Sequence, residues 1–215
     1  MTFSQTMNVQ ATVFVVDDDQ AMRSSLKWLI ESVGLAVESF ASADEFLRSY
    51  YPGRAGCLLL DVRMPGMSGL ELQEYLIEHQ IEIPVIIITG HGDVHMAVRA
   101  MKSGAVDFIE KPFNDEMLLD AIRNALTLDD RRRETRAAKA AIAERLEQLT
   151  PREHEVMEMV TAGRSNKEIA NVLGVSAKTV EAHRARVMEK MQAGSLAELV
   201  RMAIAATEEE PANRS

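Results

Sequence analysis

The feature that most limits the fold is an alternation of short strand-like runs and helical stripes over the first 124 residues. The strand candidates cover residues 12–16, 36–39, 57–60, 84–88 and 106–109. Between them, apolar residues recur every three or four positions, as on one face of a helix. Runs that are apolar on both faces are typical of a parallel sheet covered by helices on both sides. The pattern therefore predicts an α/β domain, a doubly wound (βα)5 fold of the flavodoxin-like type.

Polar residues follow the strand candidates at the point where each one ends. The positions concerned are Asp17, Asp18, Asp61, Thr89 and Lys111. Right-handed crossovers bring the carboxyl ends of parallel strands to one edge of the sheet, where ligands bind in open α/β folds. A single carboxylate there is hard to distinguish from a turn cap, but five polar residues at one edge are not explained by capping alone.

The chemistry of these side chains is mutually consistent. Two or three carboxylates form a hard oxygen site that suits Mg²⁺, which accepts phosphate as a further ligand. The ammonium of Lys111 and the hydroxyl of Thr89 can bind phosphate oxygens, and a carboxylate can accept a phosphoryl group as an acyl phosphate. Asp61 is the best acceptor candidate, since its strand is central in the flavodoxin-like order.

Residues 11–124 resemble the receiver domain of two-component response regulators. The resemblance rests on the acidic pair Asp17-Asp18, on Leu58-Leu59-Leu60-Asp61 followed by Met64-Pro65-Gly66, on Thr89, and on Lys111-Pro112. It implies that a sensor histidine kinase phosphorylates Asp61.

The same resemblance assigns the other roles at this edge. It implies that Asp18, Asp61 and the backbone carbonyl of Arg63 hold Mg²⁺ (or Mn²⁺), with Asp17 assisting, and that Thr89 and Lys111 bind the phosphoryl oxygens. Phe108 stands where the family keeps a switch aromatic, although a plain core phenylalanine is the alternative. Arg63 and His91 are expected to flank the site.

Residues 125–148 are rich in Ala, Arg and Glu and contain neither Pro nor Gly. These residues are strong helix formers, so we predict a long, solvent-exposed helical linker. Its cluster Arg131-Arg132-Arg133 is interpreted as a solvated face rather than a DNA patch. The apolar positions are too sparse to predict a coiled coil.

Residues 149–206 carry repeated helix-start signals. Thr150-Pro151-Arg152-Glu153 and Ser165 with Glu168 both have capping-box spacing, and Ser176 can cap the next helix after a turn at Gly174. A short helix, a glycine turn and a longer helix predict a helix-turn-helix within a four-helix, all-α domain. Residues 207–215 are predicted to form a disordered tail.

Helical phase divides the recognition helix into a core face and an outer face. With Val180 and Val187 inside, small and polar residues face outward to the major groove and basic residues lie toward its flanks, where phosphates are reached. The candidate DNA-binding residues are Lys167, Lys178, Thr179, Glu181, Ala182, Arg184, Ala185, Arg186 and Lys190. A charged solvent face is the alternative, and His183 is interpreted as structural.

This half resembles the LuxR/NarL-type DNA-binding domain. The matching stretches are Leu149-Thr150-Pro151-Arg152-Glu153, residues 166–170, residues 176–184 and Met188-Glu189-Lys190-Met191. Together with the receiver, the chain is similar to the FixJ/NarL family along nearly its whole length. Glu181 and Ala182 depart from the base-reading residues of some relatives, so the operator sequence does not follow.

Composition limits the compartment and the partners. The formal net charge of −9 lies entirely in residues 1–124, so it does not exclude a DNA site in the balanced second half. The one cysteine, Cys57, excludes a disulfide within the chain, and no apolar run is long enough to span a membrane. We expect a cytoplasmic protein without a membrane partner.

The functional hypothesis is a transcription regulator, not an enzyme, apart from self-phosphorylation from a phosphodonor and slow autodephosphorylation. Phosphorylation of Asp61 is expected to favour a homodimer that binds a double-stranded DNA operator, and a contact with RNA polymerase fits this role. One alternative is a regulator that works without phosphorylation. The other is a haloacid-dehalogenase-like phosphatase, with Asp17 as nucleophile and Asp129-Asp130 as its later acidic pair. Kinase, stimulus, operator, resting domain arrangement and the direction of regulation do not follow from the sequence.

Overall fold

The computed structural model describes residues 11–90 and 94–207. The chain divides into two compact units, Met1–Arg133 and Glu134–Ser215, and the division falls within one long helix. Each unit has its own hydrophobic core.

The first unit is built on a five-stranded parallel sheet. Its strands are β1 (Thr12–Val16), β2 (Ala36–Phe40), β3 (Gly56–Asp61), β4 (Val85–Thr89) and β5 (Asp107–Glu110). Their order is β2-β1-β3-β4-β5, with β3 in the middle and every neighbouring pair parallel. This order confirms the predicted doubly wound α/β fold.

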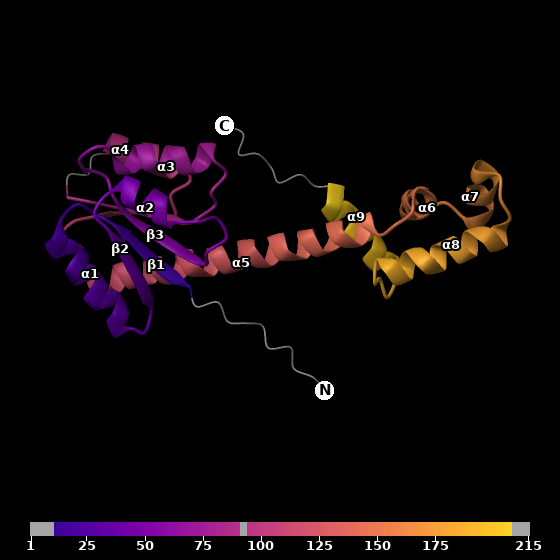
Figure 1. Ribbon diagram of the computed structural model, residues 1–215, viewed down its shortest axis with the longest axis horizontal. Helices are drawn as coiled ribbons and strands as arrows, with labels where there is room; N and C mark the ends of the chain where they lie inside the picture. Colours follow the sequence, from indigo (N-terminus) through magenta and orange to yellow (C-terminus); the bar gives the residue numbers. More distant parts are fainter. Residues whose placement is uncertain (1–10, 91–93, 208–215) are drawn as a thin grey trace. The chain divides into compact units, whose positions relative to one another are not determined.

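Helices cover both faces of this sheet (Figure 1). They are α1 (Gln20–Ser32), α2 (Ala43–Ser49), α3 (Gly69–Glu78), α4 (Val94–Lys102) and the long α5 (Asp115–Glu147). One core cluster joins the sheet to α2, α3 and α4, and the other joins it to α1 and the first turns of α5. Side chains of β3 alternate between these clusters, with Leu58 and Leu60 in the first and Cys57 and Leu59 in the second. Burial on both faces explains why the strand is apolar throughout.

The start of β3 lies very close to β1. A Cβ on Gly56 would stand 1.9 Å from the carbonyl oxygen of Thr12, so only glycine permits this approach of the two strands. The backbone amide of Gly56 donates to Asp129 Oδ2 in α5 over 3.0 Å, and Asp129 is 4% exposed.

Helix α5 continues without interruption from the first unit into the second. Arg133 Nη1 donates to the Gly53 carbonyl over 2.9 Å, and Ala125 is fully buried. The beginning of the stretch that we expected to be solvent-exposed therefore packs on the first unit. Asp129 and Arg133 are exceptions to that expectation, because the turn before β3 presents backbone groups that need partners.

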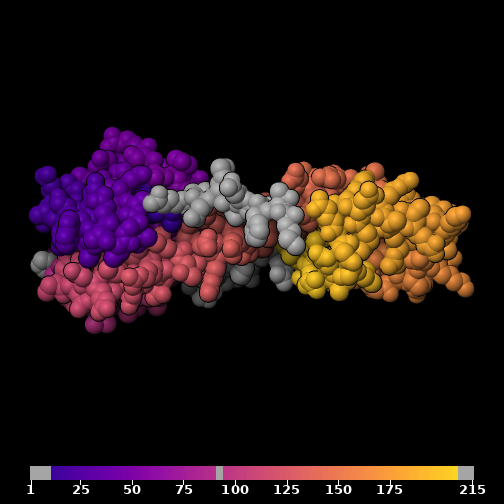
Figure 2. Space-filling model, turned by 90° about the horizontal axis from the view of Figure 1, so that it is seen from below, coloured from indigo at the N-terminus to yellow at the C-terminus, as the bar shows by residue number. Residues whose placement is uncertain are grey.

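The second unit is a bundle of α6 (Pro151–Thr161), α7 (Asn166–Leu173), α8 (Ala177–Lys190) and α9 (Leu196–Thr207). Its core contains Val156, Ile169, Val180 and Val187, and the last turns of α5 pack against it. Capping boxes at Thr150 and Ser165 start α6 and α7 as predicted. In the space-filling view, α9 lies at the surface of this unit (Figure 2).

Within the described residues, no helix has the length and apolar character needed to cross a bilayer. His91 and residues 208–215 lie outside the described residues, and Thr207, the first residue of the predicted tail, is the last residue of α9.

Candidate functional site

The carboxyl edge of the sheet brings Asp17, Asp61 and Lys111 into direct contact. The Lys111 ammonium lies 2.8 Å from Asp17 Oδ2 and 2.7 Å from Asp61 Oδ1. Asp17 is 2% exposed and Asp61 7% exposed. Three of the five residues predicted to share this edge are thus joined by two charge-assisted hydrogen bonds.

The loop after β3 fixes the other oxygen of Asp61. The backbone amide of Arg63 donates to Asp61 Oδ2 over 2.7 Å, while the Arg63 side chain is exposed. At the start of α3, a Cβ on Gly69 would stand 2.2 Å from the Asp61 carbonyl oxygen. Gly69 therefore allows α3 to begin directly against the acidic residue.

The three acidic residues after β1 have separate roles. Asp17 Oδ1 accepts from the Asp19 amide over 2.8 Å, and Asp19 in turn caps α1 through the Ala21 amide. Asp18 is exposed. Arg23 Nη1 donates to the carbonyls of Asp17 and Asp18, over 2.7 and 2.9 Å, and so holds the loop. Sequence reasoning missed Arg23, although its place one turn after an acidic cap was a usable signal.

Thr89 and Lys111 are linked through their backbones. Thr89 ends β4 and is 1% exposed, and the Lys111 amide donates to the Thr89 carbonyl over 2.8 Å. Phe108 in β5 is half-buried against the cluster that includes α3 and α4. The ring is therefore neither a fully buried core phenylalanine nor free of the core.

Electrostatics in this site depend on burial and on the ammonium. Burial raises the pKa of the Asp61 carboxyl above its ordinary value; the hydrogen bond and charge of Lys111 oppose this rise, and the charge of Asp17 adds to it. Burial alone lowers the pKa of the Lys111 ammonium, but the hydrogen bonds to Asp17 and Asp61 and the negative charges of these two residues together outweigh burial, so that pKa is raised. Lys111 therefore stays charged and partly neutralises two buried carboxylates.

The described residues contain no group of three His, Cys, Asp or Glu side chains arranged to hold a metal ion. Two buried carboxylates, the exposed Asp18 and the backbone of Arg63 nevertheless supply oxygen donors only. Mg²⁺ is ordinarily bound through one or two carboxylates, with water and phosphate completing its shell. The donor chemistry at this edge fits that ion.

The second unit holds the predicted helix-turn-helix. Helix α7 ends at Gly174, which has φ +65°, and Ser176 caps α8 through the Thr179 amide. Arg152 in α6 donates to the Leu173 carbonyl over 2.7 Å and thereby secures the turn. A left-handed residue at this point lets α8 leave at a sharp angle.

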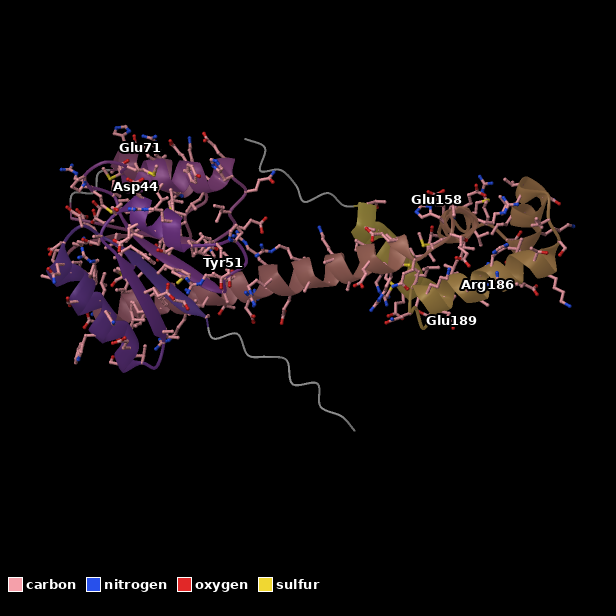
Figure 3. All side chains as sticks on the ribbon, in the orientation of Figure 1. Asp44, Tyr51, Glu71, Glu158, Arg186 and Glu189 are labelled. Carbon is pink, nitrogen blue, oxygen red and sulfur yellow. The ribbon has the colours of Figure 1, made fainter. Side chains whose placement is uncertain are left out.

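Most of the predicted DNA-binding residues lie on an exposed face. Figure 3 labels Arg186 and Glu189 on α8. The exposed candidates are Lys167 in α7 and Lys178, Glu181, Ala182, Ala185 and Arg186 in α8. Thr179 is half-buried, and its hydroxyl lies 2.8 Å from Ser176 Oγ in the cap.

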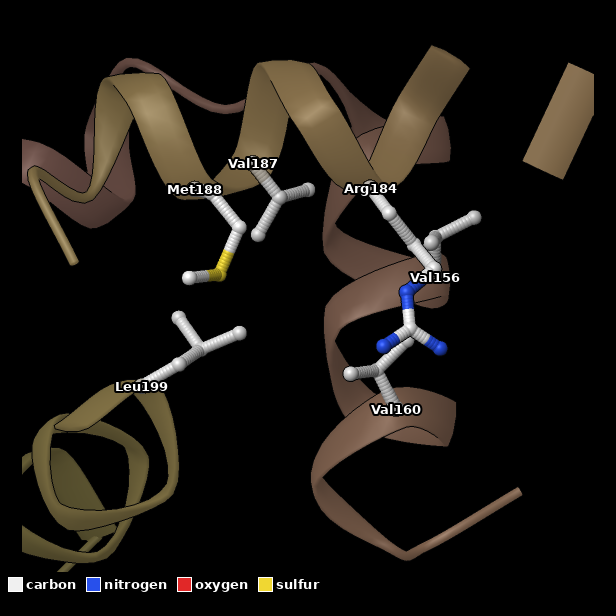
Figure 4. Close-up of a pocket in the computed structure, with 6 residues that line it drawn as sticks. All are labelled: Val156, Val160, Arg184, Val187, Met188 and Leu199. Atoms are coloured by element: carbon white, nitrogen blue, oxygen red, sulfur yellow. The ribbon is translucent and has the colours of Figure 1, made fainter. Parts of the chain in front are cut away.

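Two of the predicted phosphate contacts, Arg184 and Lys190, bond other residues of the second unit. Arg184 Nη1 donates to Asn166 Oδ1 over 2.8 Å, and its side chain extends past Val156 and Val160 of α6 (Figure 4). Lys190 Nζ lies 2.6 Å from Glu153 Oε2 and 3.0 Å from the Gln148 carbonyl. We expected both residues on the flanks of α8, but Arg184 lies in phase with the buried Val180 and Val187. The long side chain of Lys190 reaches the buried Glu153 on α6.

The geometry also removes the basis of the phosphatase alternative. Asp129 contacts Gly56 at the start of β3, whereas Asp17 and Asp61 lie at the end of the strands. A strand of this length separates its ends by roughly 15–20 Å. Asp129 therefore cannot join Asp17 in one site.

Comparison with known protein families gives two matches. Residues 13–123 match the response regulator receiver domain, and residues 147–203 match the luxR family of bacterial regulatory proteins. The chain is 51% identical over 195 residues to Nodulation protein W of Bradyrhizobium diazoefficiens, covering 91% of this chain and 86% of that protein. It is 47% identical over 201 residues to the transcriptional regulatory protein FixJ of the same organism, covering 93% and 98%.

Solved structures agree with these matches. The response regulator StyR is 46% identical with a TM-score of 0.84, covering 91% of this chain and 98% of that one. Full-length FixJ from B. japonicum is 46% identical with a TM-score of 0.55, covering 92% and 98%. These families are DNA-binding regulators, in agreement with the expectation that the chain is not an enzyme. Since a receiver and a luxR-type domain follow each other here as they do along the whole length of FixJ, the chain belongs to the FixJ-like response regulators, which control transcription in two-component systems.

Proposed function

We propose that Asp61 accepts a phosphoryl group from the phosphohistidine of a sensor kinase and thereby controls DNA binding. The observation that carries this proposal is the Lys111 ammonium held between Asp17 and Asp61, within 2.8 Å of each. In the transfer, the nitrogen–phosphorus bond breaks and a carboxylate oxygen of Asp61 forms a new bond to phosphorus. Membership of the family implies a kinase and DNA as partners.

The residues of this chain position and neutralise the transferred group. Lys111 brings a fixed positive charge to the anionic oxygens, and the Thr89 hydroxyl provides a further hydrogen bond. Asp17, Asp18, Asp61 and the Arg63 carbonyl are the proposed ligands of Mg²⁺ or Mn²⁺. When bound, the ion supplies additional neutralisation of the transferring group.

The response to phosphorylation is proposed to pass through Thr89 and Phe108 to a homodimer. Helix α4 supports a dimer surface, because Val94, Val98 and Met101 are 77%, 47% and 47% exposed and recur at helical spacing. Phe108 is half-buried at the neighbouring strand β5, so its ring can respond to changes at the site.

The proposed DNA surface is the exposed face of α8 together with Lys167. Lys178 and Glu181 would read base edges, Ala182 and Ala185 permit close approach, and Arg186 binds phosphate. Two such modules in a dimer read half-sites about one helical turn apart. Binding of an operator in the cytoplasm and a contact with RNA polymerase complete the proposal.

The domain limits of the proposal are residues 11–124 for the receiver, 125–148 for the helical linker and 149–206 for the DNA-binding domain. The packing of Ala125, Asp129 and Arg133 supports a receiver unit that includes the first turns of the linker.

Genome-wide binding with wild type, Asp61→Asn and the exposed control Asp44→Asn tests the proposal. We expect operator occupancy to rise with kinase activation in wild type and in the control, and to stay at the resting level in Asp61→Asn. Equal activation of all three proteins contradicts the proposal and favours a regulator that works without phosphorylation.

A further inference from the structure

The last residue of the recognition helix is bound to another helix of its own unit. Lys190 Nζ lies 2.6 Å from Glu153 Oε2, and the Glu153 side chain is 3% exposed. The same Glu153 oxygen accepts the Thr150 backbone amide over 2.9 Å in the capping box of α6. The ammonium therefore completes a buried cap that has no other described cation within ion-pair distance.

A second bond of Lys190 reaches the end of α5. Its Nζ donates to the carbonyl of Gln148, the residue after the last residue of that helix, over 3.0 Å. In return, Arg145 Nη1 in the last turn of α5 donates to the carbonyl of Met191, the C-cap of α8, over 3.4 Å. The last carbonyls of a helix have no partner within it. Each helix thus supplies a cation to a terminal carbonyl of the other.

Apolar packing supports the same junction. Ile142 and Leu146 of α5, together with Leu149, pack against the core that holds Val187 and Met191. The end of α8 is consequently held by two basic side chains and a shared apolar core. Turning Lys190 outward to a DNA phosphate would leave the buried Glu153 carboxylate without its cation, which is strongly unfavourable.

We propose that Lys190 and Arg145 are positioning residues for DNA recognition: they fix the C-terminal end of α8 to the α5–α6 junction, and Lys190 does not contact DNA. This inference rests on the proposed DNA surface of α8. It assigns to the linker helix a part in setting the angle of the recognition helix within the second unit.

The salt dependence of DNA binding separates positioning from phosphate contact. Full-length wild type, Lys190→Met and Arg186→Met are titrated with an operator duplex and with an unrelated duplex of equal length, from low to moderate salt. Methionine keeps an unbranched apolar stem while removing the charge. Each phosphate contact contributes about one to the slope of log affinity against log salt.

For Arg186→Met we expect the slope to fall by about one on both duplexes. For Lys190→Met we expect an unchanged slope, with operator selectivity reduced roughly tenfold, the equivalent of one lost base contact. A slope that falls by about one in Lys190→Met overturns the inference, as does unchanged selectivity. If Arg186→Met leaves the slope unchanged, the proposed DNA surface is wrong, and amide exchange then decides the inference on Lys190.

Hydrogen exchange provides a test that needs no DNA. In Lys190→Met we expect severalfold faster amide exchange over residues 148–153 and 188–193, with residues 166–173 unchanged. Unchanged exchange at both ends overturns the inference. Arg145→Met, which leaves the Glu153 ion pair in place, serves as a milder second variant should Lys190→Met fold poorly, and it is expected to speed exchange over residues 188–193.

Discussion

Asp61 combines burial with a proposed function that requires its negative charge. Its pKa is raised because burial disfavours the ionised form more than Lys111 favours it. A carboxyl whose pKa is raised on folding contributes stability below its unfolded pKa, and that contribution is lost as pH rises through the folded pKa. At neutral pH the ionised Asp61 therefore lowers the stability of the first unit, a cost that is common at functional sites.

We accordingly predict that Asp61→Asn stabilises the first unit at pH 7. The gain should stay below about 1 kcal/mol, because the hydrogen bond and charge of Lys111 offset most of the cost of burying the ionised carboxylate. Thermal unfolding of wild type and Asp61→Asn at pH 7 and at pH 3.5 measures this gain in stability. The difference in stability between the two proteins should be smaller at pH 3.5. A lower melting temperature at pH 7 contradicts the prediction.

Glu153 shows the opposite electrostatic behaviour. The hydrogen bond from Lys190, followed by that from the Thr150 amide, lowers its pKa from 4.5 to about 2. A carboxylate with a depressed pKa stabilises the fold above its unfolded pKa, and this stabilisation is lost as pH falls toward the folded pKa. We predict that the second unit loses stability between about pH 4.5 and pH 2.

Denaturant unfolding across that pH range measures this contribution. In Glu153→Gln the slope of stability against pH should become shallower, whereas the exposed Glu158→Gln in the same helix should follow wild type. Identical slopes for wild type and Glu153→Gln contradict the prediction that the ionised Glu153 stabilises the second unit.

At the scale of elements, a buried acidic residue fastens α5 to the strand that carries Asp61. Asp129 Oδ2 accepts the Gly56 amide at the start of β3, and β3 ends at Asp61. Removing the acceptor leaves a buried amide without a partner, which costs about 1–3 kcal/mol. We predict that Asp129→Ala lowers the unfolding free energy of the first unit by that amount.

The neighbouring Asp130→Ala is a matched control, since Asp130 is exposed in the next position of α5. It should change stability by less than about 0.5 kcal/mol. Urea unfolding followed by a probe in the first unit compares the two variants, and equal effects contradict the role of Asp129.

At the scale of the whole molecule, the two units have cores that share no residue among the described ones. Leu126 of α5 packs with the first unit, and Ile142 of α5 packs with the second. Separate cores predict separate unfolding transitions in calorimetry. Ile169→Ala, at a fully buried position of α7, should lower the unfolding free energy of the second unit by about 2–5 kcal/mol. The transition of the second unit then moves to a lower temperature, and that of the first unit stays unchanged. A single cooperative transition that shifts as a whole contradicts this prediction.

Local sequence patterns were sufficient to predict the fold of the first unit and the acidic edge of its sheet. Apolar strands, capping boxes and glycine turns act within a few residues of the chain, and the crossover rule then places the strand ends at one edge. For this reason the strand order, the helix starts and the meeting of Asp17, Asp61 and Lys111 followed from the sequence. The resemblance to response regulators then supplied what those residues are expected to do.

Only the tertiary structure decided which polar side chains bond groups on other elements. Asp129 and Arg184 lie on the buried faces of α5 and α8, in phase with Ala125 and with Val180, whereas Lys190 lies on the flank of α8. Each of the three bonds a group on another element. Helical phase fixes the direction of Cα–Cβ bonds, whereas the end of a polar side chain bonds the donor or acceptor that packing brings within reach. The partners are the Gly56 amide, the Asn166 side chain and the Glu153 carboxylate, and they come within reach only when the elements pack. The sequence therefore determined the acidic edge around Asp61, and packing decided which charged side chains of α8 stay exposed and which hold the fold together.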